Sequence, residues 1–433
     1  MTHIRLLCRF IVLGVIVVCL RCAPSARAGD TRLPIPYGAW DGFIQTSAGD
    51  VTFGVDLKPE GRGTSAALVN DTDRQSFSSA GWDGAVLTLR LDYYDGTLTA
   101  RFVSPQKMEG EYSRQTSKGM VHIPVTLVPR QERVPGKPWT GATLTGDWLF
   151  VRPGGATEDK VTLATFQQET TATADGRVPV TGILEPVSGD TGLLHGSVYT
   201  DSSGHTHFHL SRFDGIHALA LDGDFQPDGS LKGQLAGTAS STPFTAKRGK
   251  DAASANPNEL AGGLTKVKDP QQPFRFGGTD LSGKSVDQGS AQFKDKAVIV
   301  DVFGTWCPNC HDEAPILEKI YRKYHSQGLE IVGLAYEYTD DTARNLRQIE
   351  VYRAKYGITF PLLLAGTTAE GQIEKTLPQL VNFGAYPTTI FVGRDGRVHA
   401  IHAGFAGPST GDKYQEVQQR MDQLTREVLG PPN

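Results

Sequence analysis

The residues with the clearest capacity for chemistry are two cysteines, Cys307 and Cys310. They follow the apolar run KAVIVDVF at 296–303, and Pro308 between them suits the first turn of a helix. A spacing of three on a helix brings the two sulfurs one turn apart, within reach of a disulfide bond. A helix N-terminus also stabilises a thiolate. We therefore predict a redox-active pair in which Cys307 attacks and the more buried Cys310 resolves the mixed disulfide.

Two other roles are open to the pair, namely half of a zinc site and a purely structural disulfide. A zinc site needs further ligands, yet no second C-x-x-C occurs, and His311 adjoins Cys310 rather than standing at a ligand spacing. The remaining cysteines, Cys8, Cys19 and Cys22, all lie near the N-terminus. The redox-active disulfide is the favoured interpretation.

Three histidines, His205, His207 and His209, alternate along one predicted strand. Side chains two residues apart on a strand project from one face at about 7 Å, and an H-x-H pair can bind zinc or copper. No further ligand on a neighbouring strand can be named from the sequence. We therefore expect no metal and interpret the histidines as a polar strand face. His217, in the segment FDGIHA, is also interpreted as structural.

The segments around the cysteines alternate between the strand and helix patterns, in the order β-α-β-α-β-α-β-β-α. An unbroken apolar strand such as 296–303 is typical of the centre of a covered sheet. The inward stripe of the second helix is expected to consist of Ala343, Leu346, Ile349 and Ala354. The expected strands are 296–303, 329–335, 359–364, 388–392 and 397–403, and the expected helices are 308–327, 340–356, 368–380 and 411–429.

Several motifs in this region together resemble the thioredoxin superfamily, specifically the exported TlpA/ResA type of thiol–disulfide oxidoreductase. They are FGTWCPNC at 303–310, the EAP that holds Glu313 and Pro315, and YPTT at 386–389. The resemblance covers about residues 272–430. It implies a thioredoxin-like α/β fold and a dithiol that reduces disulfides of exported proteins, with apocytochrome c as one candidate. Electrons would come from a membrane thiol–disulfide carrier, and no cofactor besides the redox-active disulfide is implied.

The resemblance also indicates two proton-handling acids. Asp301 stands where thioredoxins carry a buried Asp, whereas ResA-like members commonly have Asn there, and Glu313 matches the acid of TlpA/ResA-type proteins. A buried carboxyl group has a raised pKa and could exchange a proton with Cys310. The alternatives are a structural hydrogen-bonding role for Asp301 and a solvated helix-start acid for Glu313. Glu337 could also face the site, although its spacing does not indicate it.

A substrate-binding surface is implied for Trp306, Tyr386, Pro387 and Thr388. In the family this proline is cis, faces the disulfide and lets the preceding backbone pair with a substrate chain. The alternatives are a turn or bulge at Pro387 and ordinary packing for Trp306.

The region from 36 to 248 has an all-β pattern, with short alternating segments separated by Asp-Gly turns at sandwich or barrel spacing. YYDGTLTA at 93–100 resembles RFDGIHAL at 212–219, and Trp40 and Trp148 each begin one half. We therefore expect two duplicated β-barrel or sandwich subdomains. The expected division is a signal peptide at 1–28, β-subdomains at 36–135 and 143–248, a linker at 249–273 and the thioredoxin-like domain at 274–430.

The first 28 residues have the pattern of a secretory signal: a cationic start, the apolar run at 10–20 and a small-x-small site at 26–28. The run is shorter than the roughly 20 apolar residues that span a bilayer. We expect export to the periplasm with cleavage after about Ala28, and an uncleaved anchor is the alternative. Cleavage would leave Cys307 and Cys310 as the only cysteines, which excludes a framework of several disulfides.

Composition adds two exclusions. A hydrophobic content of 39% over 433 residues excludes disorder as a description of the whole chain. A net charge of −4 gives no basic excess for a nucleic-acid partner. The sequence therefore predicts an exported thiol–disulfide oxidoreductase, most simply a reductase of periplasmic proteins. The alternatives are a disulfide oxidase or isomerase and a β-rich periplasmic binding protein with an accessory redox domain, since C-P-x-C does not fix the direction.

Overall fold

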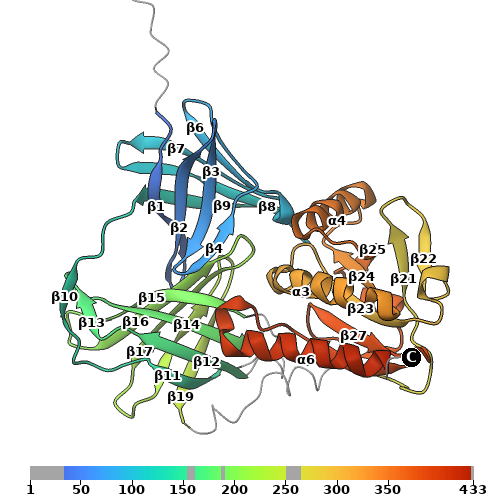
Figure 1. The fold of residues 1–433 in the computed structure, drawn as a ribbon. Coiled ribbons are helices and arrows are strands. Elements are labelled where there is room, and N and C mark those ends of the chain that lie inside the picture. Colours follow the sequence, from blue (N-terminus) through green and yellow to red (C-terminus); the bar gives the residue numbers. More distant parts are fainter. Residues whose placement is uncertain (1–33, 154–160, 187–190, 250–264, 431–433) are drawn as a thin grey trace, which may run out of the picture.

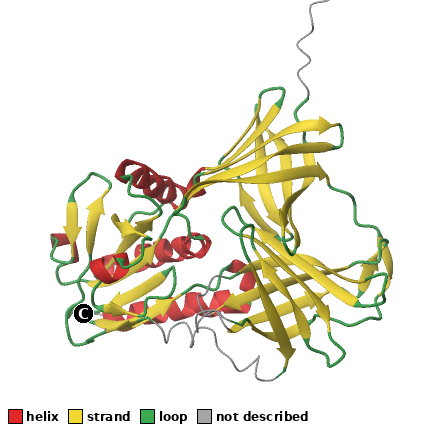
Figure 2. Ribbon diagram, turned by 180° about the vertical axis from the view of Figure 1, so that it is seen from behind, coloured by secondary structure: helices red, strands yellow, loops and turns green. Residues whose placement is uncertain are grey.

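The computed structural model describes residues 34–153, 161–186, 191–249 and 265–430. The chain forms three parts, two of them built from strands and the third from strands and helices (Figure 1). The view from behind shows that the long helices are confined to the C-terminal part (Figure 2). The predicted signal at 1–28 lies outside the described residues, as does most of the predicted linker.

The first part, which we call the first barrel, is a nine-stranded antiparallel sheet in which the first strand pairs with the last. A short connection, residues 77 and 78, joins the two edge strands β4 and β5 and forms backbone hydrogen bonds with β3 and β6. Phe77 N donates to Ala66 O on β3, and Ser78 N donates to Arg90 O on β6, so the sheet curls towards closure. A short 3-10 helix, η1 (Asp92–Tyr94), follows β6. The strands are β1 (Gly38–Thr46), β2 (Gly49–Glu60), β3 (Gly63–Asn70), β4 (Asp73–Ser76), β5 (Ser79–Trp82), β6 (Val86–Leu91), β7 (Gly96–Ser104), β8 (Lys107–Thr116) and β9 (Gly119–Pro129).

The second part is a closed barrel of eight strands, because β11 pairs with both β12 and β19. Alternate side chains point inward, and Trp148, Phe208 and Phe244 lie in its buried core. Two further strands, β10 (Pro135–Pro138) and β13 (Thr171–Thr173), pair beside it. The all-β prediction for this region is confirmed. The barrel strands are β11 (Gly146–Val151), β12 (Val161–Gln168), β14 (Val178–Pro186), β15 (Gly192–Thr200), β16 (Thr206–Phe213), β17 (Ala218–Phe225), β18 (Leu231–Ala236) and β19 (Ser241–Arg248).

The third part is a seven-stranded sheet in the order β22-β21-β25-β24-β23-β27-β28, with β23, β24 and β25 parallel. Every residue of the central strand β23 is buried, as its unbroken apolar sequence predicted. Side chains of α3, α4 and α6 cover one face of the sheet, and those of α5 cover the other. Two further strands, β20 (Lys266–Val267) and β26 (Leu380–Val381), pair separately from it. The strands of the seven-stranded sheet are β21 (Gly277–Asp280), β22 (Ser285–Asp287), β23 (Ala297–Phe303), β24 (Leu329–Glu337), β25 (Leu362–Thr367), β27 (Thr388–Val392) and β28 (Val398–Ala403), and the helices of this part are α3 (Pro308–Tyr324), α4 (Thr342–Tyr356), α5 (Gln372–Thr376) and α6 (Asp412–Leu429).

Several details of the α/β prediction were wrong. The expected strand 359–364 is β25, which covers Leu362–Thr367, and β20, β21, β22 and β26 were not predicted. The third helix is much shorter than expected, since α5 covers only Gln372–Thr376. In α4, Ile349 is buried as predicted, but Ala343 and Ala354 are exposed and Leu346 is only half-buried. The other buried residues of α4 are Asn345 and Tyr352. Both are fixed by hydrogen bonds that periodicity does not reveal: the Asn345 amide donates to Thr339 O, and the Tyr352 hydroxyl donates to Cys310 O.

Candidate active site

The two cysteines are joined in a disulfide bond, with their Cα atoms 5.2 Å apart. Cys307 is the N-cap of α3, and its sulfur accepts a hydrogen bond of 3.2 Å from Cys310 N. Pro308 begins the helix, as the sequence predicted. Cys310 is 1% exposed and Cys307 is 4% exposed. Cys307, whose sulfur receives the hydrogen bond from the helix, is therefore the less buried of the two residues.

His311 and Glu337 hold the loop that leads from β23 to the disulfide. The Thr305 N–H and hydroxyl donate to the Glu337 carboxyl at 3.0 and 2.8 Å. His311 Nε2 donates to Thr305 O at 2.8 Å, since a carbonyl can only accept, and its Nδ1 accepts from the Tyr356 hydroxyl. Burial lowers the pKa of His311 well below its usual range, so the ring is neutral. Glu337 therefore does contact the site, which its spacing alone did not indicate.

Two buried carboxyl groups lie in the core around the disulfide. Glu313 on α3 is 1% exposed, and one of its oxygens accepts a 2.5 Å hydrogen bond from the Thr389 hydroxyl. Asp301 on β23 is 4% exposed, and it pairs across the sheet with Thr389. Burial raises the pKa of both groups, and repulsion by Glu313 raises that of Asp301 further. Glu313 is therefore not the solvated helix-start acid that was one alternative.

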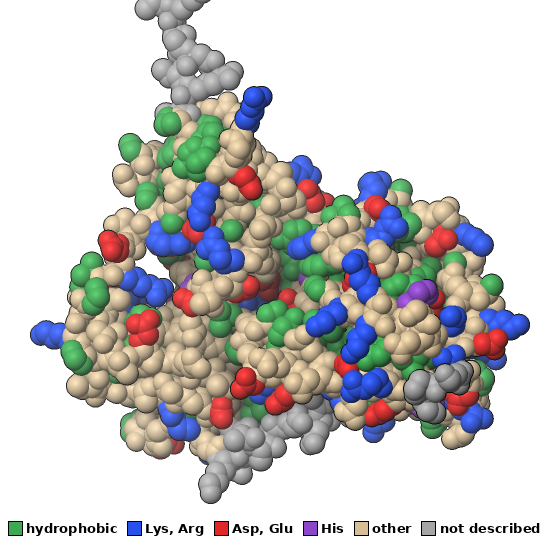
Figure 3. Space-filling view, viewed as in Figure 1, with side chains coloured by type: hydrophobic (Ala, Val, Ile, Leu, Met, Phe, Trp, Pro, Cys, Tyr) green, Lys and Arg blue, Asp and Glu red, His purple; other side chains and the backbone are tan. Residues whose placement is uncertain are grey.

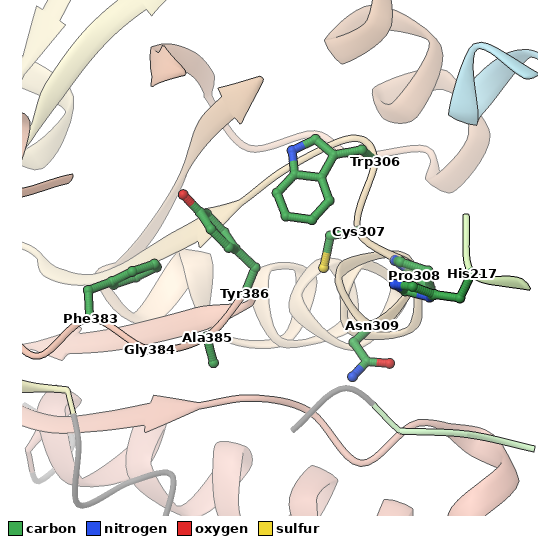
Figure 4. Close-up of a pocket in the computed structure, with 9 residues that line it drawn as sticks. All are labelled: His217, Trp306, Cys307, Pro308, Asn309, Phe383, Gly384, Ala385 and Tyr386. Carbon is green, nitrogen blue, oxygen red and sulfur yellow. The ribbon is translucent and has the colours of Figure 1, made fainter. Parts of the chain in front are cut away.

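A cavity of about 390 Å³ opens onto Cys307 (Figure 4). One wall is aromatic: the Trp306 ring lies 5.2 Å from that of Tyr386, which lies 5.0 Å from that of Phe383. The Trp306 indole N–H donates to Tyr336 O, which fixes the ring in place. The described residues that line the cavity are His217, Trp306, Cys307, Pro308, Asn309, Phe383, Gly384, Ala385 and Tyr386.

The peptide bond between Tyr386 and Pro387 is cis, as the resemblance implied. Tyr386 faces the cavity, whereas Pro387 and Thr388 are not among its lining residues. The buried Thr388 hydroxyl instead donates to Ala385 O at 2.7 Å and so holds the loop whose residues 383–386 line the cavity.

Side chains from both barrels reach this site. His217, in the turn between β16 and β17, lines the cavity beside Pro308 and Asn309 (Figure 4). From the first barrel, the rings of Tyr93 and Tyr94 lie 5.5 and 4.7 Å from that of His311. The sequence interpretation of His217 as structural missed this position. The one sequence signal for these positions is the likeness between two Asp-Gly segments, YYDGTLTA at 93–100 and RFDGIHAL at 212–219.

The three histidines of the second barrel do not form one row. His205 precedes β16, whereas His207 and His209 lie on it and both contact Asp222 at 3.0 Å. These contacts pair the rings with carboxylates of the neighbouring strand. Within the described residues, no group of three or more His, Cys, Asp or Glu side chains is placed to hold a metal ion.

Residues 266–417 match the Redoxin family. We call this matched region the Redoxin domain. This match, together with the strand order and the disulfide at the start of α3, confirms the expected thioredoxin-like fold of the C-terminal part.

Curated relatives match part of this chain. Thiol-disulfide oxidoreductase ResA of Bacillus thuringiensis subsp. konkukian is 32% identical over 120 residues, which are 28% of this chain and 61% of the relative. ResA of Halalkalibacterium halodurans is 27% identical over 34% of this chain and 75% of its own length. The chain thus spans about three fifths of the length of the first of these relatives.

A thiol:disulfide interchange protein from Chlorobium tepidum is a solved structure that resembles this chain. It is 23% identical, with a TM-score of 0.29, over 38% of this chain and all of its own. Among the described residues, no helix is long and apolar enough to cross a membrane.

Proposed function

We propose that the Redoxin domain is a thiol–disulfide oxidoreductase centre that reduces disulfides of other proteins through Cys307 and Cys310. The observation that carries the proposal is the disulfide at the N-terminus of α3, where Cys307 Sγ accepts a hydrogen bond from Cys310 N. This hydrogen bond and the helix dipole stabilise a thiolate at Cys307 once the pair is reduced. The names of the ResA relatives support the same class of reaction.

In the proposed reaction the Cys307 thiolate attacks a substrate disulfide, and the departing substrate sulfur leaves as a thiolate. Cys310 then loses its proton to the carboxylate of Glu313 or Asp301 and attacks Cys307 Sγ. That step releases the second substrate thiolate and closes the Cys307–Cys310 bond, so the substrate gains the two electrons that the pair loses. When a donor reopens the bond, the buried carboxylic acid returns a proton to the Cys310 thiolate.

Substitution of each cysteine tests the proposal in the full-length protein. With a reduced donor and a fluorescent disulfide peptide, Cys307→Ser should abolish turnover. Cys310→Ser should instead accumulate a mixed disulfide between Cys307 and the peptide, because the resolving thiol is missing. Turnover that survives Cys307→Ser would overturn the proposal.

The direction of the reaction is set by the reduction potential of the pair. A value near that of thioredoxin, about −270 mV, would support a reductase that needs a dedicated electron donor. A value closer to about −120 mV would make the protein an oxidase or isomerase instead. Equilibration of the protein with thiol buffers, followed by trapping of free thiols, measures this value.

We also propose that the protein is exported and works on periplasmic proteins, with apocytochrome c as a candidate substrate and a membrane thiol–disulfide carrier as donor. The support is the signal pattern at 1–28. Mass spectrometry of protein recovered from the periplasm would test for an N-terminus after Ala28. A cytoplasmic protein with residues 1–28 intact would contradict it.

The two barrels are proposed to be a duplicated pair. In both, the first strand pairs with the last, and the tryptophan of the first strand donates its indole N–H to the carbonyl four residues earlier. Trp40 donates to Pro36 O at 2.9 Å, and Trp148 donates to Leu144 O at 2.7 Å.

A further inference from the structure

The β16–β17 turn of the second barrel brings a basic side chain to the redox centre. His217 is the one residue of the described cavity lining that can carry a positive charge. Its ring lies next to Pro308 and Asn309, at the end of α3 that holds Cys307 (Figure 4). This position lies outside the Redoxin match, which begins at residue 266.

The turn that carries His217 is built around a buried carboxylate. Asp214 is 4% exposed and accepts hydrogen bonds from Ile216 N at 2.8 Å and His217 N at 2.6 Å. Its second oxygen lies 3.1 Å from His217 Nδ1 and 3.3 Å from Arg212 Nε. A second guanidinium nitrogen, Arg212 Nη2, lies 3.2 Å from the same His217 Nδ1, so both an anion and a cation face this side of the ring. Burial would raise the pKa of Asp214, but His217 and Arg212 outweigh it and hold that pKa well below its usual range. An ionised carboxylate therefore orients the imidazole.

The first barrel fixes the same turn from the other side. The Tyr112 hydroxyl donates to Gly215 O at 2.7 Å, and Arg114 donates to Ile216 O at 2.8 Å. Gly215 has a φ of +90°, and a Cβ there would lie 2.8 Å from Leu91 Cδ1. Residues from both barrels thus place one histidine in the lining of the cavity that opens onto Cys307, and its position is fixed before any substrate arrives.

We propose that His217 is a positioning residue of the redox centre, whose positive charge stabilises the Cys307 thiolate. The inference rests on the proposed function. In the reduction of the pair, a donor thiolate attacks Cys307 Sγ, the S–S bond breaks, and Cys310 leaves as a thiolate that takes a proton. A second donor thiolate then forms the donor disulfide and releases Cys307 as a thiolate. His217 stabilises that released anion by charge attraction in the partly enclosed cavity.

The other charged groups around the pair do not supply this charge at the cavity. Burial raises the pKa of Asp312 to about 7 and lowers that of Lys355 to about 7, and the Lys355 ammonium lies 3.0 Å from the Tyr93 ring centre. Burial also raises the pKa of three further carboxyl groups, which therefore favour the neutral acid. These groups are Asp301 on β23, Glu313 on α3 and Glu337 on β24. Asp214, whose pKa is lowered, is the carboxylate that faces His217.

The test is the pKa of the Cys307 thiol in the reduced full-length chain. Iodoacetamide alkylation is followed against pH by mass spectrometry of the Cys307 peptide, which needs no knowledge of the substrate. His217→Gln removes the charge and should raise this pKa by about one unit, with a several-fold slower alkylation near neutral pH. His217→Lys keeps a positive charge and should stay close to the wild type. His122→Gln, at an exposed ring of the first barrel, is the matched control.

If His217 served only the fold, both His217→Gln and His217→Lys would shift the Cys307 pKa by the same amount. Near-UV circular dichroism would detect the accompanying change in tertiary packing. An unaltered Cys307 pKa in His217→Gln, or equal shifts in the two variants, would overturn the inference. A failure of the proposed function would appear instead as missing peptide turnover in the wild type, with the pKa difference between variants intact.

Discussion

Glu313 and Asp301 put two carboxyl groups into the core that surrounds a disulfide. A buried oxygen of each, Glu313 Oε2 and Asp301 Oδ1, has no hydrogen-bond partner among the described residues. An ionised carboxylate left in this way would be costly, so both groups favour the neutral acid. The sequence indicated these acids through the family motifs. It could not indicate Thr389 as the partner of Glu313, because that bond joins α3 to a strand far along the chain.

The raised pKa of Glu313 predicts a pH-dependent effect of Glu313→Gln on stability. In the folded oxidised state Glu313 holds its proton more tightly than in the unfolded chain. This contribution to stability is fully present below the ordinary carboxyl pKa and is lost as pH rises through the pKa of Glu313 in the folded state. Gln keeps the acceptor for Thr389 and cannot ionise. We expect the free energy of unfolding of Glu313→Gln to exceed that of the wild type by about 1–3 kcal/mol at about pH 9. At about pH 4 the two free energies should be nearly equal.

Urea titrations of the oxidised proteins at the two pH values measure this difference. Glu374→Gln, which replaces an exposed acid on α5, serves as the matched control. It should change the free energy of unfolding by the same small amount at both pH values. A Glu313→Gln variant that is no more stable than the wild type in alkaline solution would argue against a buried neutral acid.

Among the elements, the β16–β17 turn shows what local sequence patterns can and cannot predict. Local patterns predicted β16, β17 and their Asp-Gly turn, because alternation and turn residues are properties of short segments. They could not predict that the turn meets α3, since that contact joins segments far apart in the chain. The same limit explains α4, whose buried Asn345 and Tyr352 are selected by tertiary hydrogen bonds.

The fit of this turn predicts an unusually large effect of Gly215→Ala. A φ of +90° strains any side chain, and the new methyl group would press on Leu91 and Tyr94 of the first barrel. Gly204 has a similar φ of +85°, and a methyl group added there would have nothing within 4 Å, so Gly204→Ala carries the backbone strain alone. We expect Gly215→Ala to lower the free energy of unfolding by about 1–2 kcal/mol more than Gly204→Ala, as measured by urea unfolding. Equal losses would mean that the turn moves freely away from the first barrel.

At the scale of the whole molecule, both barrels are fastened to the Redoxin domain. Asp95 of the first barrel lies 2.9 Å from Arg344 of α4, and Arg344 in turn lies 4.0 Å from Glu337, which binds the loop before Cys307. Glu185 of the second barrel lies 2.5 Å from Lys413 of α6. Charged side chains of both signs are visible around the hollow where the three parts meet (Figure 3). We therefore expect the barrels to limit access to a disulfide that is already almost fully buried.

This arrangement predicts that Asp95→Ala with Glu185→Ala makes Cys307 more accessible to large reagents. Ion pairs with one exposed partner contribute modestly, and two together would weaken docking by about 1–2 kcal/mol, which corresponds to a roughly 5- to 30-fold larger open population. In the reduced protein, alkylation of Cys307 by a polyethylene-glycol maleimide should accelerate by up to this factor. Alkylation by N-ethylmaleimide should change much less, because the small reagent fits the existing cavity of about 390 Å³.

A matched double variant separates docking from a general effect of lost charge. Glu109 and Glu350 form ion pairs within the first barrel and within α4, and neither pair joins two parts of the molecule. Glu109→Ala with Glu350→Ala should therefore leave both alkylation rates unchanged. If the large reagent reacted equally fast with the wild type and both double variants, the barrels would not restrict access. Substrate selection would then depend on the cavity wall formed by Trp306 and Tyr386 alone.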